Sequence, residues 1–154
     1  MALLLKIDPG KPDAEKLAEA VRILLEGGVA AFPTETFYGL GADALNEAAV
    51  EKIFRIKGRN FRNPLSVIVA NDREVIPLVE EIPATAKILM QTFWPGPLTL
   101  IFRAAPSVSS RLTGGTGKIG IRVSSHPVAR FLAAGLTGPL TATSANLSGG
   151  PECS

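Results

Sequence analysis

VAAFPTETFYGLG, residues 29–41, is the stretch of sequence that decides the fold. Its first four residues, Val29–Phe32, are wholly apolar and predict a short strand at the centre of a sheet, where both faces are buried. A proline, two threonines and two glycines follow, which is unusual chemistry for a plain connection. Threonines after a strand often satisfy only backbone groups, but the hydroxyls of Thr34 and Thr36 can also bind a small polar substrate.

Helix and strand patterns mix irregularly on either side of this stretch. Asp13 and Asn46 are typical N-cap residues, and each precedes an amphipathic helical pattern. Further helices are predicted over 72–80, 84–93 and 126–134, and further strands over 3–7, 65–69, 98–102, 119–123 and 140–143. Because the two kinds of element do not alternate strictly, we expect an α/β fold with a mixed, twisted sheet and flanking helices. Loops at the strand ends of such a sheet meet in one crevice, where ligands usually bind.

The bulk composition limits the class of protein. A chain of 154 residues with 46% hydrophobic content fits one domain with a substantial core. The net charge of +2 is too small to favour bulk nucleic-acid binding. Cys153 is the single cysteine, so no intrachain disulfide can form. No apolar run approaches the roughly 18 residues of a membrane span, and we expect a cytoplasmic protein that does not bind membranes.

Cations gather at the end of the second helical pattern. Lys57 and Arg59 flank Gly58, Arg62 follows, and no carboxylate lies between Glu51 and Asp72. Cations at a helix C-terminus are favoured by the macrodipole alone, which is the simpler explanation. The alternative is an oxyanion site, since an arginine fork binds phosphate or carboxylate bidentately and a lysine acts as a point charge.

A second polar cluster, Thr143–Gly150, follows the last predicted strand. It can be a simple surface turn. It can also bind a phosphate or ribose, with Ser144 and Asn146 donating hydrogen bonds and the two glycines allowing close backbone approach. Brought together with Lys57 and Arg59, this cluster would form a site for a multiply charged oxyanion such as a nucleotide phosphate.

Two tempting motifs are rejected. GTGKIG, residues 115–120, matches a dinucleotide fingerprint, but its glycines run into a predicted strand instead of a helix. A P-loop is excluded because Ile119 and Leu112 stand where Ser/Thr and glycine are required.

His126, the single histidine, precedes Pro127 at a helix start, where a structural role is expected. Catalysis would therefore depend on positioning and charge neutralisation.

Five motifs, taken in order, resemble a known family. They are Pro33–Gly41, Lys57–Arg59 with Pro64–Leu65, Trp94–Thr99, Ile121–Val123 with His126–Pro127, and Thr143–Asn146 with Ser148–Gly149. Over roughly residues 13–152 the chain is similar to the YrdC/Sua5 family of threonylcarbamoyl-AMP synthases.

The resemblance implies a twisted α/β fold around a positively charged cavity. It implies an enzyme that condenses L-threonine, bicarbonate and ATP to threonylcarbamoyl-AMP and pyrophosphate, with Mg²⁺ on the phosphates. The product would serve t6A modification of tRNA through a downstream threonylcarbamoyl transferase complex, with direct tRNA binding as a further expectation.

By position in the motifs, Lys57 and Arg59 are the expected catalytic residues. The nucleotide would be bound by these two together with Thr143, Ser144 and Asn146. Threonine would be bound by Thr34, Thr36, Arg62 and Arg122. No protein ligand to a metal is expected. Replacing Lys57 or Arg59 by alanine should abolish turnover with little loss of stability, if both are surface cations.

The sequence departs from the family pattern at two places. Many members carry a histidine where Ile68 stands, which removes one expected substrate contact. Members also continue past Ser148–Gly149 with more helix and strand, whereas this sequence stops at Ser154. We therefore expect one YrdC-like domain, residues 1–154, truncated at its C-terminal end, with an open crevice and weaker ATP binding.

Two alternatives to the synthase function are a paralogue that makes another carbamoyl-adenylate and an RNA-binding module for double-stranded RNA or tRNA.

Overall fold

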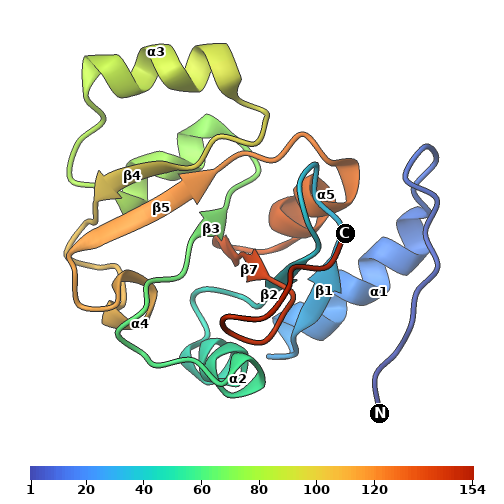
Figure 1. Ribbon diagram of the computed structural model, residues 1–154. Coiled ribbons are helices and arrows are strands. Elements are labelled where there is room, and N and C mark those ends of the chain that lie inside the picture. The colour runs from blue at the N-terminus through green and yellow to red at the C-terminus, as the bar shows by residue number, and fades with distance from the viewer.

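Two sheets organise the chain in the computed structural model, which describes all residues 1–154 (Figure 1). The first has the order β1-β2-β7, from Ala30–Phe32, Gly39–Gly41 and Thr143–Ser144, and both of its pairings are antiparallel. The second has the order β4-β5-β3-β6, from Leu100–Arg103, Lys118–Arg122, Val67–Ile68 and Leu140–Thr141. Its β3–β5 pair is parallel, and its other pairs are antiparallel. The expected mixed α/β architecture is confirmed.

The chain passes from one sheet to the other at Ala142, between β6 and β7. A single strand over 140–143 was predicted, and it is split at this residue. The hydroxyl of fully buried Thr141 accepts a hydrogen bond from the Ala42 N–H at 2.9 Å, next to β2. Gly41 fits here because a Cβ would overlap the Thr141 carbonyl and the Phe32 ring. The two sheets are therefore closely joined where the second polar cluster begins.

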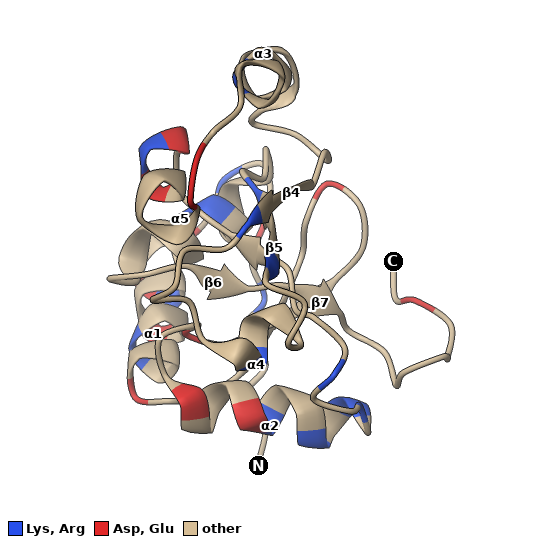
Figure 2. Cartoon of the chain, turned by 90° about the vertical axis from the view of Figure 1, so that its left-hand side faces the viewer, with Lys and Arg blue, Asp and Glu red and all other residues tan.

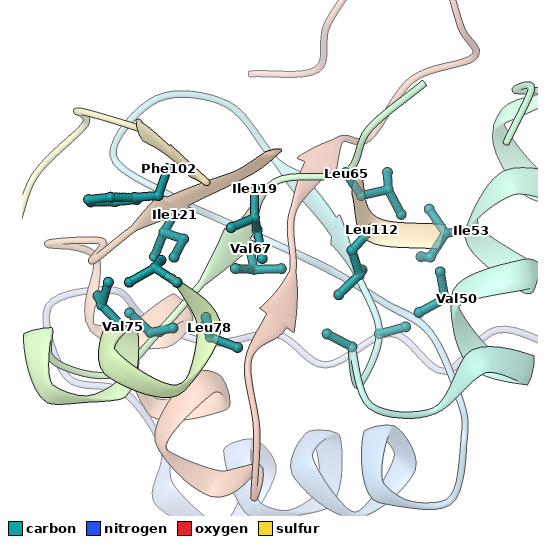
Figure 3. Packing of buried hydrophobic residues seen from close by; sticks show 14 of the residues in the cluster. Val50, Ile53, Leu65, Val67, Val75, Leu78, Phe102, Leu112, Ile119 and Ile121 are labelled. Atoms are coloured by element: carbon teal, nitrogen blue, oxygen red, sulfur yellow. The ribbon is translucent and has the colours of Figure 1, made fainter. Parts of the chain in front are cut away.

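Helices cover both faces of the four-stranded sheet. They are α1 (Ala14–Leu25), α2 (Glu47–Lys57), the 3-10 helix η1 (Asp72–Leu78), α3 (Ala84–Phe93), α4 (Ser110–Thr113) and α5 (Pro127–Gly135). Helices α1 and α5 contribute to a core cluster with Ile68 and Leu140 of the sheet. The opposite face forms the larger cluster (Figure 3), which includes Val67 and Ile121 of the sheet, Val75 of η1 and Ile53 of α2. Neighbouring residues of β3 thus face opposite cores, as the alternation of a strand requires.

The helix ends agree with the sequence. Asp13 caps α1 by accepting from the Glu15 and Lys16 N–H groups, and Asn46 caps α2 by accepting from Ala49. Gly58 ends α2 in the left-handed conformation with φ 60°, which glycine adopts at little cost. None of the helices is long and apolar enough to cross a membrane.

Three predicted elements differ from the structure. Val29–Phe32 was expected at the centre of a sheet, but β1 is an edge strand, where exposing the small side chain of Ala31 costs little. Residues 3–7 form no strand because no other strand pairs with them, and Leu4 is exposed. Within the predicted helix 72–80, a 3-10 helix forms over Asp72–Leu78 with Pro77 inside it, and Val79 is extended and bridges to Ala104.

Candidate functional site

A small cavity lies where the β1–β2 loop, the end of β5 and the β6–β7 crossing meet. Its volume is about 90 Å³, and it is lined by Thr34, Thr36, Phe37, Tyr38, Gly39, Arg122, Ala142, Thr143 and Ser144. Five predicted site residues are among these, although their segments are far apart in sequence. A larger hollow of about 250 Å³ lies beside Met90, Trp94 and Arg130. It contains no predicted site residue, so the smaller cavity is the better candidate despite its size.

Lys57 is buried beneath the second polar cluster. It is 4% exposed, and its Nζ donates to the Ser144 carbonyl at 2.5 Å, the Asn146 carbonyl at 3.0 Å and Asn146 Oδ1 at 3.3 Å. Burial, followed by the nearby charge of Arg59, lowers its pKa. The ammonium group therefore holds the loop 143–148 in place. The expectation that Lys57 is a surface cation is wrong, because its side chain is buried.

Asn146 belongs to the same network. Its side-chain amide donates to the carbonyls of Leu147 at 3.0 Å and Gly150 at 2.8 Å, while its oxygen faces Lys57. Both ends of this amide are engaged within the loop. Ser144 differs, because it lines the cavity and no protein group hydrogen-bonds its hydroxyl. The Ser144 hydroxyl is thus available to a ligand in a way that the Asn146 amide is not.

Arg59 lies between α2 and the cavity. Its guanidinium donates to Thr143 Oγ1 at 3.1 Å and to the Pro64 carbonyl at 3.1 Å, and burial lowers its pKa. It has no ion-pair partner. Figure 2 shows Lys and Arg gathered toward the C-terminal end of α2, with Asp and Glu toward its start. Basic side chains therefore gather at the end of α2 that precedes Arg59. Arg62 is exposed, and its side chain contacts none of the other predicted residues.

The two threonines of the β1–β2 loop form a directed chain of hydrogen bonds. Thr34 Oγ1 donates to the Phe37 carbonyl at 2.6 Å, so its single proton is used. The Thr36 hydroxyl, 3.0 Å away, must then donate to Thr34, and it accepts from Arg122 Nη1 at 3.3 Å. Thr34 therefore closes the loop, while Thr36 joins the loop to β5.

Glu35, between these threonines, was not among the predicted site residues. Its Oε1 lies 3.1 Å from Arg122 Nη1, and both side chains are largely buried. Its Oε2 accepts from the Ser124 hydroxyl, the Ser125 N–H at 2.9 Å and the His126 N–H at 3.2 Å. Burial favours the neutral acid, but these hydrogen bonds and the Arg122 charge outweigh it and lower the pKa of Glu35. The signal in the sequence was a lone carboxylate in an otherwise neutral loop.

The remaining motifs behave as predicted from the sequence. His126 is the N-cap of α5, and its Nδ1 accepts from the Val128 N–H at 3.2 Å, which is a structural role. The glycines of GTGKIG run into β5, and no helix follows them, so the dinucleotide fingerprint is rightly rejected. Ile68 is fully buried in the core on β3, where a histidine would meet an apolar environment.

The last residues of the chain lie against the β1–β2 loop (Figure 1). The Tyr38 N–H donates to the Cys153 carbonyl at 3.0 Å, and the Ala145 N–H donates to the Tyr38 carbonyl at 2.9 Å. Tyr38, which lines the cavity, is thus fixed through its backbone from both sides.

No group of three or more His, Cys, Asp or Glu side chains is placed to hold a metal ion.

Comparison with known proteins gives matches over most of the chain. Residues 22–154 match the Sua5/YciO/YrdC family, whose description is telomere recombination. The chain is 43% identical to a threonylcarbamoyl-AMP synthase of Pyrococcus abyssi and 47% identical to one of Bacillus subtilis, in each case over 89% of this chain. It spans about 40% of the length of these two curated relatives.

A solved structure shows the same likeness in three dimensions. The crystal structure of Pyrococcus abyssi Sua5 complexed with L-threonine superposes with a TM-score of 0.90 and 41% identity. The match covers 93% of this chain and 42% of that one. Since the family match includes more than half of the residues, the chain belongs to the Sua5/YciO/YrdC family.

Proposed function

We propose that this chain acts as a threonylcarbamoyl-AMP synthase, condensing L-threonine, bicarbonate and ATP to threonylcarbamoyl-AMP and pyrophosphate. The observation that carries the proposal is the convergence of Thr36, Arg122 and Ser144 on one cavity with Arg59 beside it. The relatives named threonylcarbamoyl-AMP synthase and the threonine complex of Pyrococcus abyssi Sua5 support it.

The two ends of the cavity suit two different anions. Arg122 and the hydroxyls of Thr34 and Thr36 would bind the carboxylate and polar groups of threonine, since a guanidinium pairs well with a carboxylate. Arg59, Thr143 and Ser144 would bind the nucleotide phosphates at the other end. Lys57 and Asn146 would act there by holding the loop. Arg62, which is exposed, would contact a substrate only if the loop containing it moved.

The reaction joins two anions, and this explains the cations. The threonine amine and bicarbonate give a carbamate and water. A carbamate oxygen then bonds to the α-phosphorus of ATP while the bond to the bridging oxygen breaks and pyrophosphate leaves. Arg59 would neutralise charge on the phosphates as the two anions approach, which lowers the barrier by preorganised electrostatics. Mg²⁺ would be bound by the phosphate oxygens, because the chain provides no cluster of metal ligands.

The product would be passed to a threonylcarbamoyl transferase complex that modifies tRNA. A carbamoyl-adenylate is a mixed anhydride and hydrolyses readily, so direct transfer would protect it. Neither a paralogous activity nor an RNA-binding role is favoured by a specific contact in the structure.

Pyrophosphate release from ATP tests the proposal. We expect release that requires both L-threonine and bicarbonate, and formation of threonylcarbamoyl-AMP observed by mass spectrometry. Release without threonine would point to a paralogue that makes another carbamoyl-adenylate. No release with any amino acid, together with tRNA binding that persists at physiological salt, would favour the RNA-binding alternative.

A further inference from the structure

Glu35 joins the cavity wall to the start of helix α5 without lining the cavity itself. Its neighbours Thr34 and Thr36 contribute to the lining, and so does its ion-pair partner Arg122. The carboxylate lies behind this wall, with its side chain 16% exposed. Any effect that Glu35 has on a ligand must therefore act through another residue.

The two carboxylate oxygens of Glu35 have separate partners. Oε2 accepts from Ser124 and Ser125 and from the His126 N–H, at the N-terminus of α5, where a negative charge is stabilised by the helix dipole. Oε1 is buried and has no hydrogen-bond partner, and it faces Arg122 Nη1 at 3.1 Å. A role in capping α5 explains Oε2 but leaves Oε1 unexplained, because burying an oxygen without a partner is costly.

The Arg122 guanidinium has few polar partners. Its side chain is 13% exposed, and besides the ion pair with Glu35 it makes one hydrogen bond, to Thr36 Oγ1 at 3.3 Å. The backbone of Arg122 is fixed separately, since its carbonyl accepts from the Val69 N–H at 3.0 Å. Removing the Glu35 charge would therefore release the guanidinium while leaving β5 in place.

We propose that Glu35 is a positioning residue that anchors the Arg122 guanidinium to α5 and so presets it to bind the carboxylate of the amino-acid substrate. This inference rests on the proposed function for the identity of that substrate. Contacts connect the N-terminus of α5 to Glu35, Glu35 to Arg122, and Arg122 to Thr36. This chain of contacts joins the β1–β2 loop to strand β5 of the other sheet. A guanidinium that is already oriented loses less conformational entropy when the substrate binds.

The first test is threonine binding by Glu35→Gln, measured by calorimetry, together with steady-state kinetics. Glutamine keeps the volume and an acceptor for α5 but presents no charge to Arg122. We expect the Kd and KM for L-threonine to rise at least about tenfold, while the KM for ATP changes less than about threefold. Ser124→Ala removes one donor to Oε2 and leaves the ion pair, so its threonine affinity should stay within about threefold of the wild type. Glu19→Gln, which breaks an exposed ion pair with Arg22 on α1, is the matched surface control.

The second test does not depend on the reaction. The ¹⁵N–¹H heteronuclear NOE of the Arg122 Nε–H, assigned with Arg122→Lys, should fall in Glu35→Gln toward the value of a freely moving side chain. If Glu35→Gln does not fold, Glu35→Asp is measured instead. Aspartate keeps the charge but is shorter by one methylene, so an intermediate NOE is expected.

An unchanged NOE in either folded variant, or wild-type threonine affinity in Glu35→Gln, would overturn the inference. Failure of the wild-type chain to bind threonine would reject the proposed function, and the NOE would still decide whether Glu35 orients Arg122.

Discussion

The two ends of the cavity bury charge in opposite ways. At the α2 end, the Lys57 ammonium is surrounded by neutral oxygens of the loop 143–148 and has no carboxylate within ion-pair distance. At the α5 end, Arg122 is paired with Glu35, so the charges cancel. The first arrangement leaves a net positive charge beside the cavity, which suits a phosphate. The second arrangement is neutral overall, so it orients the Arg122 guanidinium more than it attracts an anion by net charge.

This contrast also divides the structural tasks. In the loop at the α2 end, three acceptors converge on one side chain, the Lys57 ammonium. The loop at the α5 end is held by its own threonine hydrogen bonds as well as by Glu35. Replacing Lys57 at the first end should therefore reduce stability, whereas substitutions at the second end should mainly reduce ligand affinity.

Lys57→Met is expected to give the largest effect. Methionine nearly fills the volume but cannot donate, so oxygens of Ser144 and Asn146 lose a charged partner. We expect the free energy of unfolding in urea to fall by about 3 kcal/mol. Lys52→Met on the same helix is the control, since Lys52 makes a single hydrogen bond, to the Gly27 carbonyl, and should cost less than about 1 kcal/mol. Equal losses for the two variants would show that Lys57 does not hold the loop.

Arg59→Ala tests the excess charge at the same end. With the cation removed from beside Thr143, kcat/KM for ATP should fall about 100-fold, equivalent to about 2.7 kcal/mol. Stability should change little, since Arg59 makes two hydrogen bonds and is only half-buried. Arg55→Ala is the matched control, because Arg55 lies in the last turn of α2 near Arg59 in sequence, but its side chain is 78% exposed. A comparable loss for Arg55→Ala would mean that long-range charge alone matters.

The ends of α1 and α2 could be predicted from the sequence because their signals are local. Asp13, Asn46 and Gly58 act within one turn of their own positions, and a cap needs no distant partner. The edge position of β1 and the break at Ala142 could not be predicted, since both depend on which strands pair across long stretches of chain. Strand β2 was missed for the same reason, since its Gly41 is required by the close approach of Thr141, a residue 100 positions away.

The sequence indicated residues that lie together in the structure, but not their contacts. Thr36, Arg122 and Ser144 do converge on one cavity, as their motifs indicated. The sequence could not show that Lys57 is buried by the loop after β7, because the two are 87 positions apart. Nor could it show that Glu35 meets Arg122, which requires the two sheets to be joined. Charge patterns along a chain do not reveal which charges will be paired.

Lowering the pH should remove the stabilisation that the Glu35 carboxylate gives to the folded protein. The folded state lowers the pKa of this carboxyl below its ordinary 4.5, so its stabilising effect is present at neutral pH and is lost as the pH falls through the folded value. Arg122 and the N–H groups at the start of α5 face this carboxylate. Glu35→Gln should therefore cost about 1–2 kcal/mol at pH 7 and progressively less below about pH 4.5. Urea unfolding of both proteins across this range measures the difference, and a constant gap would show that the charge is not responsible.

Thr36→Val should give the smallest effect at the α5 end. Valine keeps the shape but removes the hydroxyl that donates to Thr34 and accepts from Arg122. Because Glu35 still holds Arg122, the KM for L-threonine should rise only about threefold, equivalent to about 0.7 kcal/mol. Thr92→Val, which removes a hydroxyl bonded to the Ile88 carbonyl on α3, should leave the KM unchanged. If Thr36→Val raised the KM as much as Glu35→Gln, the hydroxyl would contact the substrate directly, and the α5 end would bind its ligand through the loop more than through the oriented arginine.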